Sequence, residues 1–303
     1  MKRYAAIICV TALLVLFTVA TSCTFAQNKV AVISLSGPIQ SESSGFFFGG
    51  SVITPESVRT ELERARKDDG VKAIVLQIDS PGGSVAASQE IVNQLELVKK
   101  PVVVSMSDLA ASGGYYISAG ADKIVALPGT LTGSIGVISE MPNLKGLFDK
   151  LGIDMQVFIA GKHKDMYAGL RELTPEEEVI MQDMTDQLYN QFVQVVAKGR
   201  DLSEDKVREL ATGQLYTGIQ AKELGLVDEL GGLQTAIDLA ASLAGISKPE
   251  VEYYKPQAPS LLNTLLGMGW QKLQSVIQPT SLSAEDIILL ETLTNPYPQP
   301  EYR

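Results

Sequence analysis

The chain has 303 residues, 45% of them hydrophobic and 20% charged, a globular composition that fits one large domain or two small ones. The net charge of −10, with no basic cluster outside the first three residues, argues against nucleic acid as a partner. Cysteines occur only at positions 9 and 23, and His163 is the single histidine. These counts exclude a disulfide and a zinc site rich in Cys or His from the globular part, and no cofactor is expected.

Residues 1–28 have the pattern of an export segment. Lys2 and Arg3 precede an apolar run over 4–20, and small residues follow. Three fates are compatible with this pattern: lipidation of Cys23 in a lipoprotein-like box, cleavage after the small residues 24–26, or retention as a short membrane anchor. All three fates put the remaining chain on the extracytoplasmic (periplasmic or extracellular) side of the cell membrane, and lipidation or retention would also attach it there.

The first half of the chain alternates between predicted strands and helices. Apolar runs predict strands at 29–36, 72–79, 101–107 and 123–127, with helices at 54–67, 85–99 and from 115 to 120. This alternation predicts an α/β fold with mostly parallel strands and right-handed crossover helices. The Ser- and Gly-rich stretch 41–51 carries three phenylalanines, which fit either a loop with a core-anchoring aromatic or an apolar lip.

The second half becomes helical. After an apolar stretch at 135–139, a helix at 143–151 and a strand at 155–160, helices are predicted at 174–199, 203–211, 217–224 and 232–243. The proline-containing segment 246–303 differs in character, and we interpret it as an extension with one apolar helix at 260–277 and a disordered end. The predicted organisation is therefore 1–28, a domain over 29–245, and 246–303.

Two glycine-containing turns follow consecutive strands. Gly82 and Gly83 close the turn after the strand at 72–79, and Ser112 with Gly113 follows the strand at 101–107. Turns at the carboxyl ends of neighbouring parallel strands commonly face one cleft. Ser112 between a strand and a helix is typical of a nucleophile whose adjacent amides stabilise an oxyanion. The alternative is a plain turn in which Ser112 only caps the helix.

A serine nucleophile needs a base, and three residues near position 163 are candidates. His163 is the histidine option, while Lys162 and Lys164 are the lysine options. A lysine base must be neutral, which requires desolvation that lowers its pKa from about 10.4 toward 7. The pattern of residues alone leaves the choice open.

Together these segments resemble the short, single-repeat form of the bacterial signal peptide peptidase A (SppA) family, over about 29–245. The matching motifs, in chain order, are Asp-Ser-Pro-Gly-Gly at 79–83, Ala-Ala-Ser-Gly-Gly-Tyr-Tyr-Ile at 110–117, Ala-Asp-Lys-Ile at 121–124, Leu-Thr-Gly-Ser-Ile-Gly-Val at 131–137, Gly-Lys-His-Lys at 161–164, and the segment 216–229. The resemblance implies the crotonase-like fold shared with Clp-type proteases, with a helical C-terminal part.

The resemblance also implies roles for individual residues. It makes Ser112 the nucleophile and Lys164 the general base of a Ser–Lys dyad, in preference to its neighbours. Gly83 and Gly113 are expected to supply oxyanion amides, and Ser134 to orient the lysine, unless it is an ordinary turn serine.

The activity that this resemblance implies is that of a membrane-associated serine endopeptidase. Its expected substrates are cleaved signal peptides and other small or unfolded hydrophobic peptides outside the cytoplasm. Because the catalytic unit occurs once, a homo-oligomeric ring is expected, with Lys164 of one subunit against Ser112 of the next. The alternatives are the related stomatin-associated Ser–Lys protease and a non-catalytic exported peptide-binding scaffold.

Overall fold

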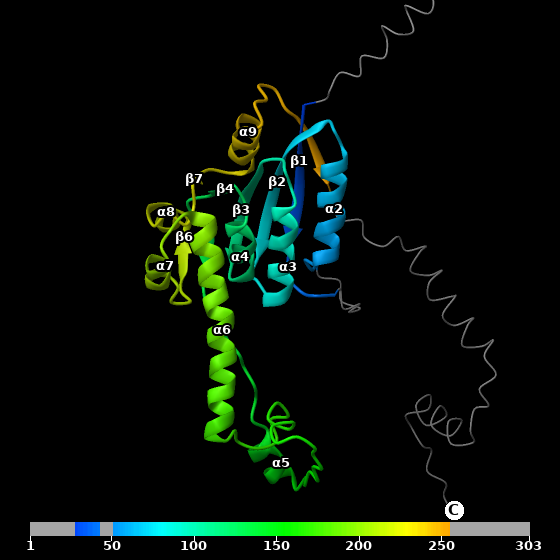
Figure 1. Cartoon of the computed structure of the whole chain (residues 1–303), viewed down its shortest axis with the longest axis vertical. Coiled ribbons are helices and arrows are strands. Elements are labelled where there is room, and N and C mark those ends of the chain that lie inside the picture. The colour runs from blue at the N-terminus through cyan, green and yellow to red at the C-terminus, as the bar shows by residue number, and fades with distance from the viewer. Residues whose placement is uncertain (1–27, 43–50, 255–303) are drawn as a thin grey trace, which may run out of the picture. The chain divides into compact units, whose positions relative to one another are not determined.

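The computed structural model describes residues 28–42 and 51–254, which form an α/β unit around an eight-stranded sheet (Figure 1). The strand order is β6-β5-β3-β2-β1-β8, with β4 also paired to β3 and β7 paired to β4, and each described pairing is parallel except that of β5 with β6. The strands are β1 Lys29–Ser36, β2 Val71–Ser80, β3 Val102–Ala111, β4 Lys123–Ala126, β5 Leu131–Gly133, β6 Leu215–Thr217, β7 Glu229–Leu230 and β8 Glu250–Tyr254. The predicted α/β class and its mostly parallel sheet are confirmed.

Helices cover both faces of the sheet, because the central strands are apolar on both sides. In β1, Ala31 and Ile33 join the core on one face, whereas Val30 and Val32 join a smaller cluster on the other. The larger core includes residues of α2 Pro55–Lys67, α3 Val85–Glu96, α4 Gly113–Ala119 and α6 Pro175–Arg200, and the smaller one includes α9 Leu233–Leu243. The helices α7 Glu204–Leu210 and α8 Gly218–Glu223 lie near β6 (Figure 1).

The helix α6 extends well beyond the sheet. Its 26 residues span about 39 Å, and its C-terminal part packs on α4, where Gly199 allows close approach to the carbonyl of Ala119. Its N-terminal part lies away from the sheet, together with α5 Lys145–Leu151 and the loops around it (Figure 1). We call residues 137–184 the arm. The arm carries the Gly-Lys-His-Lys segment.

Two parts of the sequence fold differently from the prediction. The predicted strand at 155–160 is absent: these residues have no regular structure and are exposed, because no other strand lies beside them to complete a ladder. In contrast, β8 forms inside the segment assigned to the extension, because it pairs with the edge of β1.

The predicted export segment at 1–27, the phenylalanines at 46–48 and the apolar helix at 260–277 lie outside the described residues. Among the helices of 28–42 and 51–254, none is both long and apolar enough to cross a membrane. The division into 1–28, 29–245 and 246–303 stays a prediction.

Candidate active site

Ser112 occupies a sharp turn between β3 and α4. Its backbone has φ 52° and ψ −120°, an uncommon conformation for a residue other than glycine. Two hydrogen bonds fix the turn: the Ser112 amide donates to the Gly133 carbonyl at 2.8 Å, and the Tyr116 amide donates to the Ser112 carbonyl at 2.8 Å. Ser112 occupies the N-cap position of α4, but its side chain makes no capping hydrogen bond to the helix. The hydroxyl is left half-buried and available for chemistry.

The second glycine turn lies directly against Ser112. A Cβ on Gly82 would come within 2.8 Å of the Ser112 Cβ, and a Cβ on Gly113 would lie 3.2 Å from the Gly83 nitrogen. Among the described residues, no acceptor pairs with the amides of Gly83 and Gly113. Two closely spaced, unpaired amides beside a nucleophile can donate hydrogen bonds to an oxyanion.

Two cavities open beside Ser112. One of about 510 Å³ is lined by Gly83, Ser112 and Ser134 together with residues of the loops after β5 and α7. Ser134 also has a left-handed backbone, with φ 48°, and its amide donates to the Gln214 carbonyl at 2.8 Å. A much smaller cavity of about 20 Å³ lies between Ser112 and apolar side chains, among them Leu188 and Phe192 of α6. The structure thus brings together four of the five predicted residues: Gly83, Ser112, Gly113 and Ser134.

The fifth predicted residue, Lys164, lies elsewhere in the subunit. It lines neither cavity, and the loop that carries it is bound to Glu177 in the first turn of α6. Eleven residues separate Glu177 from Leu188, which is about 16 Å along the helix axis. Lys164 is exposed, and its ammonium group has no ion pair or hydrogen bond with any described residue. Within one chain, therefore, Ser112 has no lysine beside it.

The two alternative bases are already engaged with carboxylates. Lys162 forms an ion pair with Glu176. His163 places Nδ1 3.1 Å from Glu177 and Nε2 3.5 Å from Glu176. Of the three basic residues in this loop, Lys164 is the one whose side chain remains available to a partner.

Comparison with known proteins identifies the family of this chain. The model of peptidase family S49 matches residues 95–247, and that of Clp protease matches residues 51–132. The chain belongs to peptidase family S49. A Synechocystis protein provisionally named a protease is 40% identical over 86% of this chain and 90% of its own length. An Enterococcus faecium protein provisionally named signal peptide peptidase SppA is 35% identical, over 85% and 76%. Protease 4 of Haemophilus influenzae is 35% identical over 79% of this chain and 40% of its own length.

Membership of family S49, with relatives of these names, makes the chain a serine-type peptidase with a Clp-protease-like α/β domain. Ser112, Gly83 and Gly113 all line the small cavity beside the Ser112 turn, and Ser112 and Gly83 line the larger one as well.

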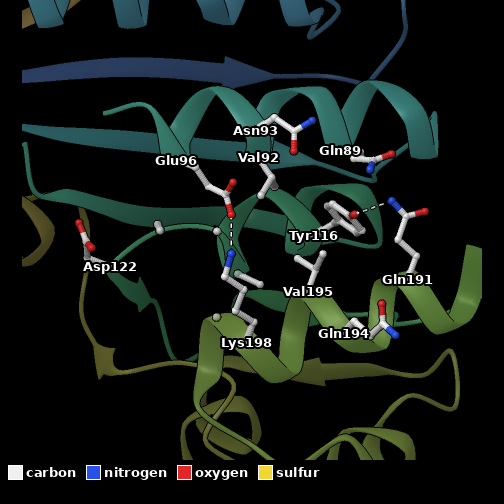
Figure 2. A pocket seen from close by; sticks show the side chains of 14 residues that line it. Gln89, Val92, Asn93, Glu96, Tyr116, Asp122, Gln191, Gln194, Val195 and Lys198 are labelled. Atoms are coloured by element: carbon white, nitrogen blue, oxygen red, sulfur yellow. Dashed lines mark hydrogen bonds and ion pairs between the residues drawn. The ribbon is translucent and has the colours of Figure 1, made fainter. Parts of the chain in front are cut away.

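A further cavity in this S49 peptidase was not predicted from the sequence, and it lies beside α4, the helix that follows Ser112. About 390 Å³ in volume, it lies between α3, α4 and α6 and does not include Ser112 (Figure 2). Tyr116 lines this cavity on one side and the small cavity beside Ser112 on the other. Its hydroxyl accepts a hydrogen bond from Gln191 at 3.3 Å, and burial raises its pKa. The Tyr-Tyr pair is evident in the sequence, but Tyr116 forms a wall of both cavities only because α6 packs beside it.

Proposed function

We propose that this S49 peptidase is a membrane-associated endopeptidase with a Ser112–Lys164 dyad, acting on cleaved signal peptides and other small or unfolded hydrophobic peptides outside the cytoplasm. The observation that carries the proposal is the strained Ser112 turn with two unpaired amides in an open cavity. The apolar side chains of Leu188 and Phe192 beside Ser112 are compatible with an apolar substrate. The name of the Enterococcus relative supports the choice of substrate.

The chemistry follows from these positions. The Ser112 hydroxyl oxygen attacks the scissile carbonyl carbon while its proton passes to the neutral Lys164 amine. The amides of Gly83 and Gly113 donate to the resulting oxyanion. Lys164 then gives the proton to the leaving amine, and an acyl-enzyme forms on Ser112. Water, deprotonated by Lys164, hydrolyses this ester and restores the serine.

The dyad is proposed to form between neighbouring subunits of a ring. Lys164 cannot serve Ser112 of its own chain, and it lies on an arm with a large exposed apolar surface. Phe158 is 91% exposed, and Leu151 is 62% exposed. Exposed apolar patches of this kind mark interaction surfaces, and a head-to-tail contact that repeats with rotation closes a ring. The arm of one subunit would place its lysine beside the serine of the next.

Labelling and complementation test this function. Wild type should react with a fluorophosphonate and hydrolyse an apolar fluorogenic peptide, whereas Ser112→Ala and Lys164→Ala should do neither at a measurable rate. His163→Ala should retain most activity. Co-assembled Ser112→Ala and Lys164→Ala subunits should recover activity, because some interfaces contain one intact pair.

Three outcomes would contradict the proposal. Co-assembly shown by native mass measurement without recovered hydrolysis would refute the shared site. A wild-type protein that binds peptides but neither labels nor cleaves would instead indicate the non-catalytic scaffold. Fractionation of cells, with the protein found in soluble extracts only, would contradict membrane association.

A further inference from the structure

The arm contains a compact group of charged side chains centred on Arg171. The guanidinium donates two hydrogen bonds to Asp165, both at 2.8 Å, and two to Glu177, at 2.7 and 2.8 Å. Both contacts are bidentate, which is the strongest geometry that an arginine–carboxylate pair adopts. The side chain of Glu177 is only 2% exposed. A carboxylate this deeply buried is held in place by several donors at once.

Glu177 joins the arginine to two further elements. It accepts a hydrogen bond from the Thr174 amide at 3.0 Å, which completes the capping box at the start of α6. It also lies 3.1 Å from His163 Nδ1. Asp165 and His163 are the two residues that adjoin Lys164 in the sequence. The loop is therefore fixed on either side of the lysine, while the lysine itself makes no contact through its ammonium group with the described residues.

This polar group replaces a hydrophobic core in the arm. Over residues 136–191, Met166 is the one hydrophobic residue that is buried. Apolar packing within the subunit therefore contributes little to the position of the loop 161–171. The hydrogen bonds of Arg171 and Glu177 hold the loop in place instead. The Arg171 guanidinium also holds the pKa of Glu177, and that of Asp165, below their usual ranges, so both carboxylates remain charged partners near neutral pH.

We propose that Arg171 is the positioning residue of the general base: by binding Asp165 and Glu177 together, it fixes the loop so that Lys164 projects toward the neighbouring Ser112. Arg171 touches neither substrate nor the reacting atoms in this scheme. The inference rests on the proposed function, because it assumes that Lys164 is the base and acts on another subunit. A proton acceptor displaced by 1 Å can lose about 100-fold in rate, so a loop anchor has a large effect on catalysis.

The first test separates positioning from folding. Arg171→Ala should lower kcat for the apolar peptide about 10- to 100-fold, with KM and assembled mass nearly unchanged. The loss of a partner of Glu177 should speed hydrogen exchange in the loop 161–171 and leave exchange in the sheet unchanged. Arg171→Lys keeps the charge but loses the bidentate fork, so it should recover part of the lost kcat. Arg59 also bridges two glutamates, Glu56 and Glu63, but it does so on the exposed face of α2. Arg59→Ala is thus the matched control and should keep wild-type kinetics.

The second test uses complementation to assign Arg171 to the lysine side of the site. Arg171→Ala subunits retain a sound Ser112, so mixing them with Ser112→Ala subunits should restore about a quarter of the interfaces in a random assembly. Mixing them with Lys164→Ala subunits should restore none, because both then lack a working base. A structural defect would prevent recovery in either mixture.

The outcomes distinguish this inference from the proposed function. If Ser112→Ala and Lys164→Ala complement each other but Arg171→Ala complements neither, the positioning role is wrong. Wild-type kcat in Arg171→Ala also overturns it. If the Ser112→Ala and Lys164→Ala mixture co-assembles without activity, the shared site fails. The inference then falls with the shared site, because it requires Lys164 to act on the Ser112 of a neighbouring subunit.

Discussion

Replacing Gly83 by alanine tests the proposed oxyanion donors most directly. Gly83 has φ 150°, and a Cβ there would lie 2.1 Å from the Ile39 carbonyl oxygen. Real Cβ contacts essentially never fall below 3.0 Å, so the two groups must separate by about 0.9 Å. Ile39 has little freedom to move, because its amide donates to Gly82 at 2.8 Å and its carbonyl accepts from Ser84 at 2.9 Å. The amide of residue 83 must therefore shift.

The shift should affect catalysis more than binding. An oxyanion donor works at 2.7–3.1 Å, so a displacement of about 0.9 Å removes most of its hydrogen bond in the transition state. The loss of one such donor lowers kcat about 100- to 1,000-fold, equivalent to about 2.7–4 kcal/mol. Strain at this backbone conformation costs stability as well, on the order of 1–3 kcal/mol. Steady-state hydrolysis of an apolar peptide measures the first effect, and thermal unfolding measures the second.

Gly129→Ala is the matched control, because a Cβ at Gly129 meets no atom within 4 Å. It should keep both kcat and melting temperature. The reasoning is refuted if folded Gly83→Ala retains a third or more of the wild-type kcat, or if its loss appears in KM alone. Either result would show that the amide of Gly83 does not contact the transition state.

Four further results are expected. Lys164→Ala should abolish hydrolysis while Lys162→Ala, which removes a surface ion pair with Glu176, should change kcat less than about threefold. Tyr116→Ala should join the small cavity beside Ser112 to the 390 Å³ cavity and so raise cleavage after bulky apolar residues. Tyr116→Phe should keep the wild-type preference, and profiling with a peptide library measures both variants. Hydrolysis should rise with pH, because only a neutral amine accepts the serine proton. In the folded state the pKa values of Asp165 and Glu177 are lowered, mainly by hydrogen bonds from the Arg171 guanidinium. The stability that these carboxylates contribute is therefore complete above about pH 5 and is lost as acid protonates them below about pH 4. Hydrogen exchange in 161–171 should increase only below about pH 4.

The fold was largely predictable because the residue patterns that favour each strand and helix locally agree with the burial of these elements in the folded sheet. The apolar run of β2 is buried on both faces, as a central parallel strand requires. Thr54 and Thr174 each precede a proline, and both form the capping boxes that start α2 and α6. The Gly-Gly turn and the Ser112 turn meet because the strands they follow are neighbours in the sheet.

The arm was less predictable because its structure depends on contacts that join its loop to the start of α6. Met155, Val157 and Ile159 alternate as they do in a strand, yet no strand lies beside them, and all three are exposed. The motif that contains Lys164 lies near the other motifs in the sequence, but it does not indicate that Lys164 and Ser112 are separated in the folded subunit. The engagement of Lys162 by Glu176 likewise becomes visible only once the loop is placed against the start of α6.

Separation of nucleophile and base has a consequence for control of the peptidase. A subunit carries Ser112 and its oxyanion amides in one place and Lys164 in another, so under the proposed scheme an isolated subunit cannot cleave. Assembly then supplies the missing group, provided that the loop bearing the lysine is already ordered on the arm. If the loop became ordered only on docking, the conformational entropy it lost would reduce the net binding free energy of the interface and weaken assembly. The four hydrogen bonds of Arg171 remove that cost in advance, which explains why a buried carboxylate persists in an arm that has almost no core.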